Sequence, residues 1–183
     1  MTITGEPAAG AYRDRVQMTL SQLAVALDGR LVGSDGVVQG VSIDSRELVP
    51  GQMFVALVAE RDGHDFVGAA CERGARACLV SRPVGVAPEV SVVEVPDTAT
   101  ALQDLGRFAR DELAHAAVVG ITGSVGKTST KDLLAAILSQ AGVTAASERS
   151  FNNEIGLPLT LANAPADCRF VVTEMGARGL GHI

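Results

Sequence analysis

The spacing of apolar residues along the chain predicts a succession of short helices and strands. A polar stretch over residues 1–17 predicts a flexible leader. Apolar residues then recur at helical spacing between Thr19, which is placed to cap a helix, and Gly29, which is placed to end it. Residues 38–43 and 53–58 lie on either side of a Pro-Gly turn and are predicted to form two strands.

Helical and strand periodicities alternate from residue 64 onwards. A helix is predicted over residues 64–73, with His64 at its cap, because apolar residues recur every three or four positions. Short apolar runs predict strands at residues 77–80 and 90–95, and a longer amphipathic helix is predicted over 97–113.

A second unit begins near residue 116. Its predicted elements are a strand at 117–122, a glycine-rich loop at 123–126, a helix at 129–140, a strand at 143–146, a short helix at 158–162 and a strand at 170–174. The helix after the loop is expected to turn four aliphatic side chains inward, namely Leu133, Leu134, Ile137 and Leu138. The order of strand, loop, helix and strand predicts a right-handed parallel α/β unit.

The predicted fold class is therefore α/β with two domains. Residues 18–115 are expected to form a small mixed α/β N-terminal domain, and residues 116–183 the start of a parallel-sheet domain. Three strands in the second unit would leave long apolar edges exposed, which intact domains avoid. We therefore expect the chain to be a fragment of a longer protein or a truncated gene product.

Composition and charge argue against several classes of protein. Of 183 residues, 47% are hydrophobic and 20% charged, which suits a globular core and argues against disorder. The net charge of −6 and pI near 5.0 argue against a nucleic-acid partner. No apolar run reaches the ~20 residues that a membrane span needs, and no signal peptide is evident, so we expect a cytoplasmic protein. The three cysteines have no metal-ligand spacing and are expected to be buried thiols.

A glycine-rich loop between the strand and the helix of the second unit carries the strongest chemical signal. The usual phosphate loop begins with a glycine at the position that Ile121 occupies here, so only the shorter form is present. Gly123 and Gly126 can adopt positive φ and turn backbone N–H groups around phosphate oxygens. Lys127 can reach the β- and γ-phosphates, and the Thr128 hydroxyl can bind Mg²⁺. We expect ATP to contact Gly123, Ser124, Val125, Gly126, Lys127, Thr128 and Ser129.

Three further groups of polar residues are weaker candidates. Glu174 ends an apolar strand, where a carboxylate can hold Mg²⁺ beside the phosphate loop or can be a solvated acid. Asn152 and Asn153 can orient phosphate or substrate, although asparagine pairs more often form turns. An acid, a hydroxyl and a planar cation at residues 44–46 can bind a polar ligand or form a solvated turn, and these residues are Asp44, Ser45 and Arg46.

Together these strings resemble the Mur ligase family of ATP-dependent enzymes. The segments that carry the resemblance are TGSVGKTST at 122–130, DSR at 44–46 followed by PGQMFVAL at 50–57, DGHDF at 62–66, NNEIGLP at 152–158 and EMGA at 174–177. Within the family they are most similar to the actinobacterial enzymes that add D-alanyl-D-alanine to UDP-N-acetylmuramoyl-tripeptide. The resemblance covers about residues 18–183.

The resemblance implies a mechanism and assigns roles. The N-terminal domain would hold the UDP-sugar through Asp44, Ser45 and Arg46, and the second unit would be the first part of a P-loop ATPase domain. ATP would phosphorylate the terminal carboxylate of the UDP-N-acetylmuramoyl-tripeptide, and the amine of D-alanyl-D-alanine would attack the acyl phosphate. The catalytic residue would be Lys127, the Mg²⁺ ligands Thr128 and Glu174, and the substrate contacts in the same cleft Asn152 and Asn153.

The same resemblance implies what the chain lacks. The sequence lacks a later Asp-His element, the carbamylated lysine that holds a second Mg²⁺, and the C-terminal domain. We therefore expect the chain alone to be inactive. We also expect the full-length protein to be a monomer. Val125 stands where a polar residue is common. Two alternatives remain: a short non-catalytic module that binds a nucleotide or UDP-sugar, and a sister ligase that adds the third stem residue.

Overall fold

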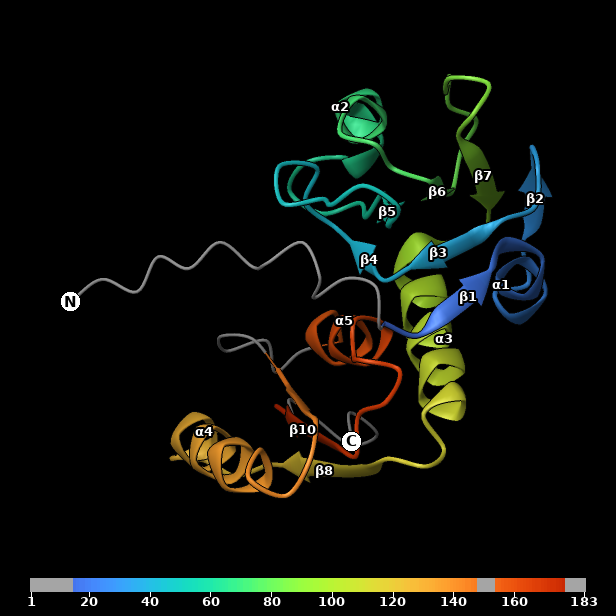
Figure 1. Cartoon of the computed structure of the whole chain (residues 1–183). Coiled ribbons are helices and arrows are strands. Elements are labelled where there is room, and N and C mark those ends of the chain that lie inside the picture. Colours follow the sequence, from blue (N-terminus) through green and yellow to red (C-terminus); the bar gives the residue numbers. More distant parts are fainter. Residues whose placement is uncertain (1–14, 148–153, 177–183) are drawn as a thin grey trace.

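The computed structural model describes residues 15–147 and 154–176, which form two α/β units (Figure 1). The first unit contains β1 (Gln17–Thr19), α1 (Leu20–Ala26), β2 (Arg30–Val32), β3 (Val37–Gln39), β4 (Val41–Ser42), β5 (Met53–Val55), the 3-10 helix η1 (Gly63–Phe66), α2 (Val67–Glu72), β6 (Ala77–Val80), β7 (Ser91–Glu94) and α3 (Thr98–Glu112). The second contains β8 (Ala117–Ile121), α4 (Lys127–Leu138), β9 (Thr144–Ala146), α5 (Gly156–Ala162) and β10 (Phe170–Glu174). The predicted α/β class is confirmed.

The first unit is built on a five-stranded sheet with the order β2-β7-β6-β5-β4. The strands from β4 to β7 are parallel, and β2 pairs with β7 in the antiparallel direction. Alternate residues of β5 and β6 belong to two different apolar clusters, because successive side chains of a strand point to opposite faces. Phe54 and Cys78 pack with residues of α2, whereas Met53 and Leu79 pack with residues of α1 and α3.

The second unit has a three-stranded parallel sheet with the order β8-β10-β9. The strand that comes last in the sequence therefore lies in the middle of the sheet. As a result, the end of β10 lies beside the end of β8, from which the glycine-rich loop departs. The register pairs Glu174 with Ile121.

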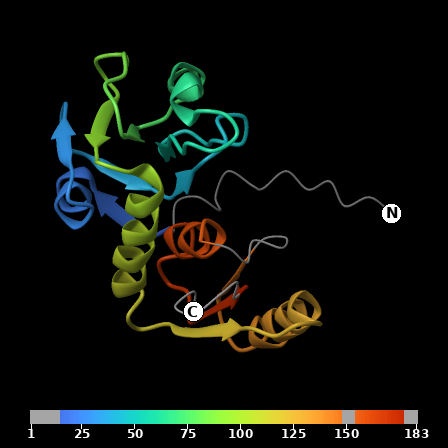
Figure 2. The same cartoon turned by 180° about the vertical axis from the view of Figure 1, so that it is seen from behind.

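The two units meet where α3 packs against α5 (Figure 2). A Cβ atom added to Gly106 of α3 would lie 2.8 Å from the Cα atom of Pro158 in α5, so glycine permits this close approach. Asn163, directly after α5, adds a polar contact with the first unit. Its side-chain amide donates to the carbonyl of Val41 at 2.9 Å and accepts from the Val41 N–H at 3.1 Å.

Several predicted boundaries are wrong. The single strand predicted at 38–43 is divided at Gly40, where φ is 81°, so that β3 pairs with β1 while β4 joins the five-stranded sheet. The short strands β1 and β2 escaped prediction, since three residues are too few to establish a period. The predicted leader reaches residue 17, yet Val16 is buried and β1 begins at Gln17.

The helix after the glycine-rich loop also differs from its prediction. It begins two residues earlier than expected and ends at Leu138. Leu134 and Leu138 are half-buried, but Leu133 and Ile137 are 64% and 57% exposed, so the expectation that all four face inward is wrong for these two. The buried residue of this helix is Lys131. The three cysteines are free thiols. Cys78 and Cys168 are buried as expected, but Cys71 is only half-buried.

Candidate nucleotide-binding site

The glycine-rich loop lies between the end of β8 and the start of α4. Gly123 has a φ of 152° and Gly126 a φ of 79°, in the region that non-glycine residues rarely adopt. The nearest atom to a Cβ added at Gly123 is 3.8 Å away, and none lies within 4 Å at Gly126. Glycine is therefore required at these two positions by the backbone conformation and not by steric crowding.

This conformation directs the loop into the N-terminus of a twelve-residue helix. The first-turn N–H groups of a helix have no intrahelical acceptor, and the helix dipole adds partial positive charge at this end. Lys127 closes the loop on itself, because its Nζ donates a hydrogen bond to the Gly123 carbonyl at 2.8 Å. The loop residues themselves are exposed. The arrangement can surround an anion with backbone donors and one mobile ammonium group.

The two predicted metal ligands lie together at the edge of this loop. The Thr128 hydroxyl donates a hydrogen bond to Oε2 of Glu174 at 2.8 Å. Glu174 is 2% exposed, and its carboxylate is held at the end of the central strand of the sheet. A hydroxyl and a carboxylate in contact fit Mg²⁺, which binds few protein oxygens and keeps several water molecules. In the described part of the chain, no group of three or more His, Cys, Asp or Glu residues could hold a metal ion.

The predicted substrate residues of the first unit follow β4, at the carboxyl-end edge of the parallel strands. The Arg46 guanidinium binds both carboxylate oxygens of Asp44, with Nη2 at 2.6 Å from Oδ2 and Nε at 2.9 Å from Oδ1. These hydrogen bonds hold the pKa of Asp44 at about 2. Ser45 is only 7% exposed. The structure thus presents Arg46 to solvent and buries the serine, so the three side chains do not face outward together.

Sequence reasoning missed a second cation beside this turn. The positive charge of Arg61 also contributes to the low pKa of Asp44, which places Arg61 within electrostatic reach of it. The Arg61 guanidinium lies 5.7 Å from the centre of the Phe66 ring, in cation–π geometry. The signal was present in the sequence as the cation directly before the DGHDF string.

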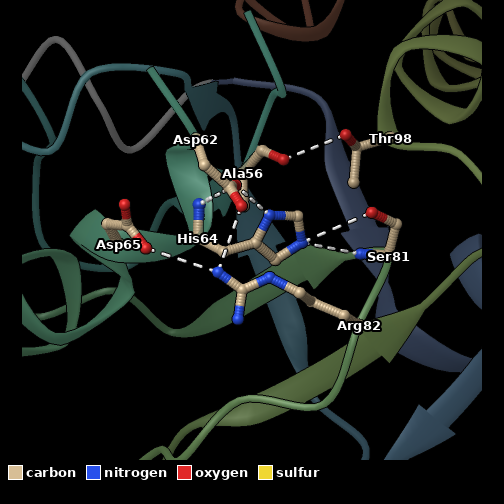
Figure 3. A network of polar contacts seen from close by, with 7 residues as sticks. All are labelled: Ala56, Asp62, His64, Asp65, Ser81, Arg82 and Thr98. Carbon is tan, nitrogen blue, oxygen red and sulfur yellow. Dashed lines mark hydrogen bonds and ion pairs between the residues drawn. The ribbon is translucent and has the colours of Figure 1, made fainter.

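A buried histidine fixes the loop that carries Arg61 (Figure 3). His64 Nε2 accepts the backbone N–H of Ser81 at 2.9 Å, so the proton of the neutral ring lies on Nδ1, 2.6 Å from Oδ1 of Asp62. Asp62 also accepts the His64 backbone N–H, and these bonds, with Arg82, hold its pKa at about 2. The helix cap is therefore Asp62, and the expectation that His64 caps the helix is wrong.

A shallow cavity of about 430 Å³ lies at the other end of the same sheet edge, near β2, β6 and β7. Arg30, Ser81, Arg82 and Glu94 contribute its polar lining. Arg30 and Glu94 form an ion pair at 2.6 Å, and Arg82 pairs with Asp62, so these three charged groups of the cavity are already matched. Asp28, which also lines the cavity, forms no ion pair within the described residues. Asn152 and Asn153, the remaining predicted site residues, lie outside the described residues.

Comparison with known proteins gives this geometry a family. Residues 37–110 match the family described as "Mur ligase family, catalytic domain", and residues 121–182 match the "Mur ligase middle domain". The chain belongs to the Mur ligase family. The match to the middle domain contains the glycine-rich loop, Thr128 and Glu174.

Individual Mur ligases match over most of the chain. UDP-N-acetylmuramoyl-tripeptide–D-alanyl-D-alanine ligase of Escherichia coli is 43% identical over 169 residues, which are 92% of this chain and 37% of the relative. The enzyme of the same name from Mycobacterium tuberculosis is 36% identical over 195 residues, covering 92% of this chain and 38% of the relative. The chain therefore spans less than two fifths of the length of these relatives.

Solved structures show the same relationship. A crystal structure of MurF from Acinetobacter baumannii superposes with a TM-score of 0.81 at 32% identity, covering 92% of this chain and 38% of that one. MurF ligase from Thermotoga maritima, solved in complex with ADP, has a TM-score of 0.63 at 33% identity, covering 79% of this chain and 33% of that one. None of the helices in residues 15–147 and 154–176 is long and apolar enough to cross a membrane.

Proposed function

We propose that this chain supplies the UDP-sugar-binding and ATP-binding parts of a ligase that joins D-alanyl-D-alanine to UDP-N-acetylmuramoyl-tripeptide. The observation that carries the proposal is the contact between Thr128 and Glu174 beside a glycine loop at a helix N-terminus. A hydroxyl and a carboxylate beside a loop of backbone donors can bind ATP together with Mg²⁺. The relatives of the chain are named as the ligase that joins these two substrates. Synthesis of the peptidoglycan stem would be its cellular role.

The residues of the second unit would act on the phosphates of ATP. Backbone N–H groups of the loop and of the first turn of α4 would bind the β- and γ-phosphate oxygens. Lys127 would leave the Gly123 carbonyl and place its ammonium against the transferring phosphoryl group. Thr128 and Glu174 would hold Mg²⁺, which supplies charge neutralisation when bound. No new strand movement is needed, because the two side chains are already in contact.

The reaction would proceed in two steps. The γ-phosphoryl group moves from ATP to the terminal carboxylate of the tripeptide, and ADP leaves. The amine of D-alanyl-D-alanine then attacks the acyl phosphate, an amide bond forms, and inorganic phosphate and a proton are released. The first step needs stabilisation of charge on the phosphoryl oxygens, which the loop donors and Lys127 provide.

The first unit would bind the nucleotide-sugar at the edge where β4 and β5 end. Arg46 is exposed there, and its planar guanidinium can bind diphosphate oxygens in a bidentate manner. Arg61, held by its loop over Phe66, adds a second cation near the same turn. Asp44 would then orient Arg46 rather than contact the ligand, and the buried Ser45 would shape the turn.

Calorimetry on the full chain tests the two halves of the proposal separately. MgATP is titrated into the wild type, into Lys127→Ala, and into Arg107→Ala, which removes an equal charge from an exposed site on α3. We expect binding to weaken by more than tenfold in Lys127→Ala only. UDP-N-acetylmuramoyl-tripeptide should lose affinity in Arg46→Ala and keep it in Lys127→Ala.

The outcomes separate the candidate functions. Binding of neither ligand by a folded wild type would refute both site assignments. Binding of both ligands is shared by the ligase and the non-catalytic module, so a second measurement decides between them. Ligation of D-alanyl-D-alanine by the chain joined to the remaining length of its Escherichia coli relative would support the ligase, and its absence would support the binding module.

A further inference from the structure

Lys131 is a buried cation that the proposed reaction does not use. The sequence contains only two lysines, and both lie on α4, with Lys131 one helical turn after Lys127. Lys131 is 4% exposed, and its Nζ donates to the backbone carbonyl of Ser147 at 2.6 Å. It also forms an ion pair at 3.0 Å with Asp132, whose side chain is largely exposed. Burial of an ammonium group is costly, so its position calls for a structural reason.

The Ser147 carbonyl would ordinarily belong to the sheet. The parallel register pairs Val172 with Ala146, and the Ser147 N–H donates to the Val172 carbonyl at 3.0 Å. Continued by one step, the same ladder would have the Ser147 carbonyl accept the N–H of Glu174. Lys131 occupies that carbonyl instead.

The displaced N–H finds a different acceptor. Glu174 N donates to the Ser147 side-chain hydroxyl oxygen at 3.4 Å, and the Thr160 hydroxyl of α5 donates to the same oxygen at 3.3 Å. Lys131 and Ser147 thus connect α4, β10 and α5 through the residue that follows β9. The residue whose backbone they hold is Glu174, which bears the carboxylate that contacts Thr128.

We propose that Lys131 is a positioning residue for the magnesium-binding carboxylate. By taking the Ser147 carbonyl it ends the β9–β10 ladder at the Val172–Ala146 pair, two residues before Glu174. On the side of Glu174 that faces away from β8, the backbone N–H is left to the serine hydroxyl. The proposal rests on the proposed role of Thr128 and Glu174 as Mg²⁺ ligands. Without the ammonium, the Ser147 carbonyl loses its partner, and we expect it to turn toward the Glu174 N–H. The ladder would then extend by one step, and the carboxylate would move away from Thr128.

Lysine suits this position for a steric reason. Its compact ammonium reaches the carbonyl on a four-carbon stem and needs no planar space, whereas a guanidinium would need more room in a buried site. Methionine has a similar length and no charge. Lys131→Met therefore removes the hydrogen bond while it keeps most of the packing.

Nucleotide affinity with and without metal tests the proposal. The full chain and its variants are titrated with ATP in excess Mg²⁺ and with ATP in a chelator, and the ratio of the two affinities is compared. Loss of a residue that orients a metal ligand typically costs 10–100-fold in metal affinity. We expect the ratio of ATP affinity with Mg²⁺ to ATP affinity without it to be at least about tenfold smaller in Lys131→Met than in the wild type. Its metal-free affinity, which depends on the loop and Lys127, should stay within about twofold of the wild type.

Two serine variants, one a test and one its control, decide the question if Lys131→Met does not fold. Ser147→Ala removes the hydroxyl that accepts the Glu174 N–H, and we expect the same selective loss. Ser139→Ala is the same substitution at the exposed end of α4, where the hydroxyl donates to the Ala135 carbonyl, and it should behave as the wild type.

Three other outcomes overturn the proposal, in two distinguishable ways. The positioning role alone is refuted if Lys131→Met gains as much affinity from Mg²⁺ as the wild type does. It is also refuted if the variant loses the same affinity with and without metal. If Lys131→Met is unfolded, the same criteria apply to Ser147→Ala. A wild type that gains no affinity from Mg²⁺ refutes the ligand roles of Thr128 and Glu174 first, and the positioning role with them.

Discussion

Replacement of Gly106 by alanine tests the joint between the two units. The added Cβ would lie 2.8 Å from both the Cα and the Cβ atoms of Pro158, and a contact under 3.0 Å with backbone forces one helix to move. Overpacking of this kind costs about 1–3 kcal/mol. Alanine in a helix interior recovers about 1 kcal/mol relative to glycine, so we expect a net loss of up to about 2 kcal/mol.

The matched control is Gly68→Ala in α2. No atom lies within 4 Å of a Cβ added there, and the residue is exposed. The substitution should therefore stabilise the protein, by about 0.5–1 kcal/mol, because alanine has the better helix propensity. The two variants carry the same chemical change and are expected to have opposite signs.

Urea unfolding followed by circular dichroism measures both variants against the wild type. A lower midpoint for Gly106→Ala together with a higher midpoint for Gly68→Ala is the expected pair of results. If Gly106→Ala were stabilised to the same extent as the control, α3 and α5 would not approach each other as closely as described. The position of the second unit against the first would then need revision.

Three further substitutions test polar contacts in the same urea assay. Asn163→Ala should lower the free energy of unfolding by about 2–3 kcal/mol, because the Val41 N–H and carbonyl lose their partner, and an unchanged midpoint would refute this contact. The pKa of Asp62 is about 2 in the folded protein, below its usual 3.8, so the stabilisation it provides is present above pH 4 and lost as pH falls toward 2. Asp62→Asn, beside His64, should flatten that part of the pH profile, and an identical slope would contradict the assignment. Thr98→Val should cost about 1 kcal/mol, because the buried hydroxyl donates to a carbonyl at 2.9 Å, and a stability equal to that of the wild type would exclude that bond.

The sequence predicted the elements whose signals are local. Strands at 77–80 and 170–174 were correct to the residue, because continuous apolar runs between turn residues mark buried parallel strands. The glycine-rich loop was located because positive φ and a helix N-terminus are both encoded in a few neighbouring residues. The general rule for parallel sheets also anticipated that Glu174 lies near Thr128.

Positions that depend on distant partners were missed or misplaced. Gly40 divides the strand predicted at 38–43, and its Cβ position is blocked by Asn163 and Arg15, which no local pattern can reveal. Leu133 and Ile137 follow helical spacing, yet they face outward in the described part of the chain because the sheet contacts α4 on its other side.

The two lysines of α4 show most clearly what the sequence alone predicts and what only the tertiary structure determines. Lys127 was proposed as a phosphate ligand from sequence alone, because that proposal depends on its place in a loop whose conformation is locally determined. Lys131 has the same side chain one turn later, and nothing in its neighbours distinguishes it from a solvated helix residue. Its burial and its contact with the Ser147 carbonyl exist only once β9 and β10 are paired beneath the helix. Local conformation is set by neighbouring residues, whereas burial depends on which distant segments the fold brings together.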